Sequence, residues 1–169
     1  IIVDDGSTDD TGKIADEYKE KYPSIVKVIH KENGGHGSGI NAGLDNATGL
    51  YFKVVDSDDW LDVSSYQTYL SKIKENYEKH IDVDVYFTNF VYENVTLNEQ
   101  YEMDYSHRFP VNKVFSWNEV HHFKTGQYAL MHAMTYSLNL LRKSKIRLLE
   151  KTFYVDNILA FKPLAFASK

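Results

Sequence analysis

Short apolar runs alternate with amphipathic segments along the first third of the chain. The runs at 1–3, 24–30 and 50–55 are rich in isoleucine and valine and are bounded by polar turn residues, which is typical of buried strands. Between them, 9–22 and 40–47 carry apolar positions at helical spacing. Strand, helix, strand, helix, strand in this order predicts a parallel βαβ arrangement.

The second half of the chain lacks this regular alternation. Its pattern predicts helices at 62–79 and 138–144 and from about Val155, and strands at 82–95 and 131–136, with an exposed antiparallel strand around Tyr101, Met103 and Tyr105. The sheet is therefore expected to be mixed and mostly parallel, flanked by helices. We expect residues 1–169 to form a single α/β domain.

Composition narrows the function classes. The 169 residues include no cysteine, which excludes disulfides, cysteine-ligated zinc and cysteine nucleophiles. The net charge of −5 and the absence of a basic run argue against nucleic-acid binding, and no apolar run is long enough to predict a membrane span. Because the sequence opens inside a strand pattern at Ile1, we interpret it as a fragment of a longer protein.

Three polar clusters each follow a predicted parallel strand: Asp4 to Asp9, Asn33 to Gly39, and Asp56 to Asp59. In open α/β sheets, ligands bind outside the carboxyl ends of the strands. The clusters are therefore expected to meet at one ligand site. Capping of the next helix is the simpler explanation for Ser7, Thr8 and Asp9.

The acidic turn after the third strand carries the strongest chemical signal. Asp56 and Asp58 lie two residues apart, so in extended backbone they project the same way. Two carboxylates held together repel each other unless a cation neutralises them, and Mg²⁺ or Mn²⁺ takes carboxylates together with substrate phosphates. On this stretch alone, a metal–phosphate site and a solvated acidic turn are both open.

Other motifs do not fit. The glycines at 34, 35, 37, 39 and 43 match neither a dinucleotide-binding nor a Walker pattern, so the loop either approaches phosphate with its amides or packs tightly on the sheet. The acidic turn lacks the glycine of a calcium-binding loop. His36 is interpreted as a loop histidine rather than a ligand.

Five stretches taken together resemble the family 2 glycosyltransferases, which are inverting enzymes of the GT-A fold that use nucleotide sugars. These stretches are Ile2–Asp9, Asn33–Gly35, Asn41–Leu44, Ala47–Phe52 and Asp56–Asp59. The later segment 152–157 is similar, more loosely, to the part of the family that supplies the catalytic base. Between about 80 and 130 no resemblance is found.

The resemblance implies a role for each matching residue. Asp5, with Asp4, contacts the nucleoside; Asp56 faces the ribose or sugar; Asp58, assisted by Asp56, binds a divalent cation (Mn²⁺ or Mg²⁺) on the diphosphate; and Asp156 is the general base. Residues 1–62 then form the nucleotide-binding half, and residues 63–169 supply the acceptor side and the base.

The remaining donor contacts are expected from Asn33, Gly35 and Lys53. The family often has arginine at the position of Ile40, so a phosphate-binding cation is missing there, and Lys31, Lys53 or His36 is expected to substitute. The family's first strand precedes Ile1, so the GT-A sheet lacks that strand in this fragment.

The implied partners are a nucleotide sugar, with a UDP-sugar expected, and an acceptor glycan or glycolipid of bacterial surface-polymer synthesis. The implied location is the cytoplasm or the cytoplasmic face of the membrane. Two alternatives stay open: a sugar nucleotidyltransferase on a related sheet, and a non-catalytic module that keeps the fold and binds nucleotide.

Overall fold

The computed structural model describes residues 1–169 as a mixed α/β arrangement. The strands are β1 (Ile2–Asp4), β2 (Val28–His30), β3 (Tyr51–Phe52), β4 (Val85–Phe87), β5 (Phe90–Asn94), β6 (Glu99–Met103) and β7 (Met134–Ser137). The helices are α1 (Thr11–Lys21), α2 (His36–Asn46), α3 (Val63–Glu78), α4 (Leu138–Ser144) and α5 (Asp156–Phe161), with 3₁₀ turns at Trp117–Glu119, Met131–Ala133 and Pro163–Phe166. None of the helices combines the length and the apolar character needed to cross a bilayer.

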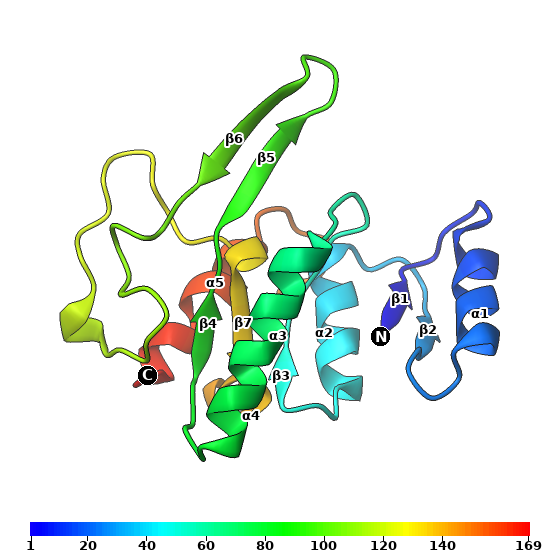
Figure 1. Ribbon diagram of the computed structural model, residues 1–169. Helices are drawn as coiled ribbons and strands as arrows, with labels where there is room; N and C mark the ends of the chain where they lie inside the picture. Colours follow the sequence, from blue (N-terminus) through cyan, green and yellow to red (C-terminus); the bar gives the residue numbers. More distant parts are fainter.

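The strands form three separate hydrogen-bonded sheets (Figure 1). β1 pairs with β2 in parallel, β7 lies between β3 and β4 and runs antiparallel to both, and β5 pairs with β6 as a hairpin that projects from the body. The expected mixed α/β class is confirmed. The antiparallel share is larger than expected because β7 inserts between β3 and β4, and strand–helix alternation along the chain carries no signal for such an insertion.

The register of the central sheet assigns its two faces. Tyr86 of β4 pairs with Thr135 of β7, and Val85 pairs with Tyr136, so alternate residues point to opposite faces. The Tyr86 ring packs edge-on against Tyr69 of α3, with centroids 5.8 Å apart. On the other face, the Tyr136 hydroxyl donates to the carbonyl of Leu159 in α5 at 2.9 Å. Helix α3 therefore covers one face of the sheet and α5 the other (Figure 1).

The hydrophobic core lies mainly in the second half of the chain. Seventeen buried residues form one cluster, and Ile40 of α2 is its member from the first 62 residues. Ile40 is thus a core residue, which explains an apolar side chain at the position where the resemblance leads one to expect arginine. The first half contributes less buried apolar surface and depends more on polar contacts.

Helix α2 begins four residues earlier than the predicted 40–47, at His36. Gly35 has a φ of +81°, which turns the chain directly into the helix. A β-carbon on Gly37 would lie 2.2 Å from the carbonyl oxygen of Leu149, so only glycine lets the helix pack this closely on the C-terminal segment. Part of the glycine-rich stretch is therefore helix rather than loop.

Three predicted strands are also shorter than expected. The run 50–55 forms only β3, because pairing with β7 is limited to Tyr51 and Phe52. The run 24–30 pairs only at 28–30, because Ile25 lies in a turn and is 80% exposed. The run 82–95 is divided between β4 and β5 at Thr88 and Asn89, where the chain leaves β7 and enters the hairpin. The Asn89 side chain then bridges to Glu102 and accepts from the amide of Tyr105, which fixes the base of the hairpin.

The remaining helices and the exposed strand agree with the structure, whereas the strand predicted at 131–136 begins only at Met134. The predicted helices at 62–79 and 138–144 and the one from Val155 correspond to α3, α4 and α5. The predicted exposed antiparallel strand near Tyr101 is β6. The predicted strand 131–136 is a 3₁₀ turn followed by β7.

Candidate functional site

Asp4, at the end of β1, is buried and its carboxylate is used by the fold. One oxygen accepts the amide of Ser7 at 2.9 Å, and the other lies 2.9 Å from Nδ1 of His30. The His30 and Ser7 contacts lower the pKa of Asp4 to about 2. Asp4 in turn raises the pKa of His30, with help from Asp16 on the other ring nitrogen. Asp4 thus holds β1, β2 and the turn after β1 together.

Asp5 is also occupied by internal contacts. Its oxygens accept from the Lys31 ammonium at 2.5 Å, from the amide of Gly34 at 3.1 Å and from the amide of Gly35 at 2.7 Å. Burial opposes ionisation of Asp5, but these donors outweigh it and hold its pKa below the usual range. The carboxylate therefore fixes the loop that carries Asn33, whose own side chain is exposed.

The acidic turn after β3 contacts the start of α2. His36 Nε2 lies 3.0 Å from Asp56 Oδ1, which lowers the pKa of Asp56 and raises that of His36. Asp156, the first residue of α5, adds a smaller charge effect that also raises the pKa of His36. The structure thus joins the start of α2 to the acidic turn through His36 and Asp56, and the charge of Asp156 acts on the same histidine.

A second pair crosses from the acidic turn to the segment before β7. His132 Nδ1 lies 3.0 Å from Asp59 Oδ2, in an orientation that is not a hydrogen bond, so this buried nitrogen has no hydrogen-bond partner. Ligand atoms of Asp56, Asp59 and His132 all lie within 4.8 Å of one another. Two carboxylates and an imidazole at this spacing fit a divalent transition-type cation such as Mn²⁺.

Asp58 does not belong to this group. Its side chain is exposed and makes no hydrogen bond or ion pair within the chain. Asp59, rather than Asp58, completes the group with Asp56 and His132 that could hold a cation. Sequence reasoning did not identify His132 or single out Asp59, because no spacing along the chain relates Met131–Ala133 to the acidic turn.

Lys53 lies beneath the acidic turn and is mostly buried. Its ammonium donates to the carbonyl of His132 at 2.6 Å. Burial lowers its pKa to about 8, against an opposing effect of Asp59. Lys31, the other lysine expected to replace the missing arginine, is bound to Asp5. Lys53 is therefore the lysine of the two that lies beside the acidic turn.

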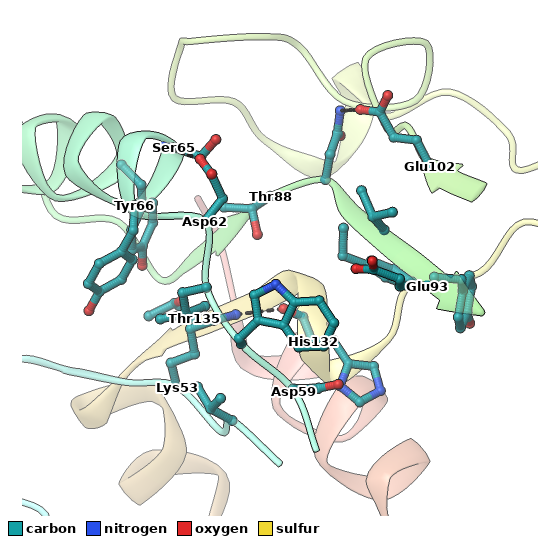
Figure 2. A pocket seen from close by; sticks show the side chains of 18 of the residues that line it. Lys53, Asp59, Asp62, Ser65, Tyr66, Thr88, Glu93, Glu102, His132 and Thr135 are labelled. Carbon is teal, nitrogen blue, oxygen red and sulfur yellow. Dashed lines mark hydrogen bonds and ion pairs between the residues drawn. The ribbon is translucent and has the colours of Figure 1, made fainter. Parts of the chain in front are cut away.

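A cavity of about 600 Å³ opens beside the acidic turn (Figure 2). Asp58, Asp59 and Trp60 form one wall, the start of α3 a second, and the hairpin β5–β6 a third. Figure 2 shows Asp62, Ser65 and Tyr66 on the helix side, Glu93 and Glu102 on the hairpin side, and Asp59 next to His132. Asp156 and His36 are not among the residues that line this cavity.

Comparison with known proteins identifies the family to which the chain is similar. The family model described as glycosyl transferase family 2 matches residues 1–137. The chain is 40% identical over 88 residues to the glycosyltransferase GlyA of Streptococcus pneumoniae. This alignment covers 52% of this chain and 12% of GlyA. It is 25% identical over 162 residues to the minor teichoic acid biosynthesis protein GgaA of Bacillus subtilis. This alignment covers 94% of this chain and 35% of GgaA.

A solved structure extends the similarity to the whole fold. The crystal structure of S. aureus TarS 1–349 in complex with UDP-GlcNAc matches with a TM-score of 0.66 and 26% identity. The match covers 95% of this chain and 42% of the TarS chain. In each of these three comparisons the aligned part is less than half of the relative's length.

Proposed function

The chain belongs to glycosyl transferase family 2, and we propose that the protein containing it transfers a sugar from a nucleotide sugar to an acceptor hydroxyl. The observation that carries this proposal is the grouping of Asp56, Asp59 and the unpartnered His132 nitrogen beside a large cavity. Relatives named as glycosyltransferases and as a teichoic acid biosynthesis protein support a role in bacterial surface-polymer synthesis.

The donor is a UDP-sugar in this proposal. The UDP-GlcNAc complex of TarS, which shares this fold, supports a uracil nucleotide. The nucleoside would lie along the loop after β1 and the loop carrying Asn33 and Gly35, at the carboxyl ends of β1 and β2. Asp4 and Asp5 act there mainly by shaping the loop, since both carboxylates are already hydrogen-bonded.

A divalent cation would be held by Asp59, His132 and Asp56, with Asp58 free to reach the same ion or the sugar. When bound, the ion neutralises the charge that develops on the departing diphosphate. An imidazole beside two carboxylates favours Mn²⁺ over Mg²⁺, because Mg²⁺ prefers an all-oxygen octahedral shell. Below about pH 8, Lys53 adds a positive charge beside the turn.

The transfer step needs a base on the acceptor side, and Asp156 is the proposed one. The acceptor oxygen attacks the anomeric carbon, a new carbon–oxygen bond forms, and the bond to the diphosphate breaks, so that UDP leaves with the bonding pair. The acceptor proton passes to the Asp156 carboxylate. In-line attack from the opposite face inverts the anomeric centre. The similarity of residues 152–157 to the family segment that supplies the base supports this role, and the charge of Asp156 also acts on His36.

Calorimetry on the complete protein tests the donor proposal. UDP, GDP and dTDP are titrated with and without Mn²⁺, and we expect UDP to bind most tightly and only weakly in the absence of metal. Asp156→Ala should retain UDP binding and lose transfer. A complete protein that binds no nucleoside diphosphate would refute the proposal. One that binds UDP but never releases it from a UDP-sugar would favour the non-catalytic alternative.

A further inference from the structure

The segment from the end of α4 to the end of α5 differs in charge from the rest of the chain. Residues 142–162 hold six lysines and arginines against two acidic residues, Glu150 and Asp156, whereas the whole chain holds 19 basic and 24 acidic residues. Helix C-termini favour cations, which accounts for Arg142 and Lys143 in the last turn of α4. The later cations of the segment have no such explanation. A local basic surface on an acidic protein indicates an anionic partner.

The segment that follows α4 directs its cations outward. Buried and exposed residues alternate along it, and Ile146 and Leu148 are the buried ones that join the core. This alternation is typical of extended backbone, in which successive side chains point to opposite sides. The exposed residues between and beside them are Lys145, Arg147 and Leu149. One side of the segment therefore packs on the protein, and the other presents basic and apolar side chains to solvent.

Most of these cations have no acidic partner within the chain. Arg147 is the exception, because it pairs with Asp45 at 2.8 Å. The Lys162 ammonium, at the end of α5, donates to the carbonyl of Lys145 at 3.4 Å, which brings these two lysines together without a carboxylate between them. The exposed lysines of the segment that form no ion pair are Lys143, Lys145, Lys151 and Lys162. Their ammonium groups remain available to anionic groups from outside the chain.

Exposed aromatic rings occur in the same part of the chain. The chain has nine phenylalanines, and the exposed ones are Phe153, Phe161 and Phe166. Phe153 is 89% exposed, and the neighbouring Tyr154 is 84% exposed. Phenylalanine is usually buried, and apolar side chains exposed next to one another mark interaction sites. These rings therefore indicate that the partner has an apolar part as well as an anionic one.

The backbone holds the two most exposed rings in solvent. Lys151 and Tyr154 have φ angles of +51° and +60°, which residues other than glycine rarely adopt. The Lys151 amide donates to the carbonyl of Gly34 at 2.7 Å, so the loop is fixed to the glycine-rich stretch before α2. Backbone strain of this kind costs free energy and is concentrated at functional sites. An anchored, strained loop that exposes Phe153 and Tyr154 is therefore a candidate contact surface.

From these observations we infer that the four unpaired lysines, together with Leu149, Phe153 and Tyr154, form a surface that docks the protein on a bilayer of anionic lipids. Lysines near such a bilayer are attracted by its negative surface potential, and aromatic rings are favoured at the level of the headgroups. A polyanion in water would contact the lysines but leave the rings solvated, so the combination of both favours the bilayer. The inference goes beyond the proposed transferase function and does not depend on it, since docking requires neither donor nor metal.

Co-sedimentation of the complete protein with vesicles tests this. The vesicles consist of phosphatidylcholine alone, or of phosphatidylcholine with about 30% phosphatidylglycerol, which supplies the negative surface potential. We expect binding to the mixed vesicles to be at least about tenfold tighter and to weaken as salt is added. Equal binding to both kinds of vesicle, or binding to neither, would overturn the inference. Calorimetry with UDP on the same sample reports separately on the proposed function.

A pair of double variants locates the electrostatic part of the surface. Lys145→Gln with Lys151→Gln should weaken binding to the mixed vesicles about thirtyfold, or about fivefold for each lysine. Lys13→Gln with Lys19→Gln removes the same charge from exposed positions of α1 and should change binding less than about twofold. All four positions are exposed, so the unfolding temperatures should match that of the wild type.

A second pair tests the aromatic part. Phe153→Ser should weaken binding to the mixed vesicles about tenfold, because a phenylalanine ring that leaves water on docking is lost. Tyr77→Ser removes an aromatic ring that is 64% exposed on α3, outside the proposed surface, and should leave binding unchanged. The measurement is again the vesicle concentration at half-maximal binding.

The other possible partners give different results. Equal effects within either pair of variants overturn the inference, because vesicle binding would then not use this surface. Tighter binding to polyphosphate than to the mixed vesicles would identify an anionic polymer as the partner and would also overturn it. Self-association of the wild type that disappears in the Lys145→Gln, Lys151→Gln variant, without vesicle binding, would identify a second copy of the chain instead. Each of these results leaves the proposed function standing if UDP still binds.

Discussion

Two acidic clusters follow strands β1 and β3, and they use their carboxylates in different ways. After β1, Asp4 and Asp5 accept hydrogen bonds from His30, Lys31 and backbone amides. After β3, Asp58 makes no internal contact, and Asp59 faces a histidine nitrogen without a proper hydrogen bond. In the first cluster both carboxylates are saturated by the protein, whereas in the second only Asp56 has a hydrogen-bond partner, His36.

This difference separates structural from chemical roles better than residue type does. A saturated carboxylate has little capacity left for a ligand, whereas the exposed carboxylates of Asp58 and Asp59 are solvated by water that a ligand can displace. Judged by their acidic residues alone, both clusters were equally good candidates for a ligand site. The internal hydrogen bonds indicate that the first cluster stabilises its loop and that the second is available to bind a ligand.

Asp59→Asn is expected to have the largest effect. In the complete protein, transfer should fall on the order of a hundredfold or more, because one charged ligand of the proposed cation is lost. Thermal stability should hardly change, since Asp59 makes no hydrogen bond that supports the fold. The measurement is kcat at saturating donor and Mn²⁺, together with the unfolding temperature.

The control for Asp59→Asn is Asp10→Asn, an exposed residue at the start of α1 with no capping hydrogen bond. It removes the same charge and should leave transfer intact. A loss of stability without a loss of transfer in Asp59→Asn would reverse the assignment of the two clusters.

Gly37→Ala should destabilise the protein by about 1–3 kcal/mol, the usual cost of overpacking. Its added methyl would meet the Leu149 carbonyl, so α2 would have to move away from the C-terminal segment. Gly39→Ala is the matched control in the same helix, with no atom within 4 Å of the added carbon. The control should stabilise by about 0.5–1 kcal/mol from the loss of backbone entropy in the unfolded chain. Urea unfolding distinguishes the two, and equal effects would show that the close approach is absent.

Asp5→Asn tests whether a carboxylate of the first, hydrogen-bonded cluster has a structural role. Asparagine cannot accept from the Lys31 ammonium and both glycine amides as a carboxylate does, so stability should fall by about 1–3 kcal/mol. Unfolding and UDP titration are measured on the same sample. If stability stays unchanged and UDP affinity falls sharply, Asp5 is a nucleoside ligand, as the family resemblance implies, and the saturated cluster is functional after all.

The sequence predicted the order of strands and helices in the first half, because strand–helix alternation is a local pattern. Its errors have a common physical cause. The start of α2 depends on how closely Gly37 approaches Leu149, and the break after β4 depends on β7. Both are contacts between segments far apart in the chain.

The candidate site divides in the same way. Asp56 and Asp58 were proposed because they lie two residues apart, and Asp156 was proposed from resemblance; of these, the group that could hold a cation includes Asp56. His132 and the hairpin wall of the cavity were missed because only the fold brings them to the acidic turn. The roles proposed for the individual residues remain predictions.

Substitution of Lys53 gives the smallest expected effect. It tests whether burial of the Lys53 ammonium beside the acidic turn lowers the stability of the protein. Burial lowers its pKa from 10.5 to about 8 in the folded protein. Below about pH 8 both states carry the proton, so the penalty for burying the charge is constant. Between about pH 8 and 10.5 the unfolded chain keeps the proton and the folded protein loses it, so stability rises with pH, by at most about 1.4 kcal/mol per pH unit.

Lys53→Met removes this titration. In EDTA, the stability of the wild type relative to Lys53→Met should therefore increase by about 1–2 kcal/mol from about pH 7.5 to about pH 9.5. Lys74→Met, on the exposed side of α3, should show no such pH-dependent difference. A flat difference for Lys53→Met would mean that its ammonium is solvated. The acidic turn would then hold no strained charge, and its contrast with the saturated cluster would rest on Asp58, Asp59 and His132 alone.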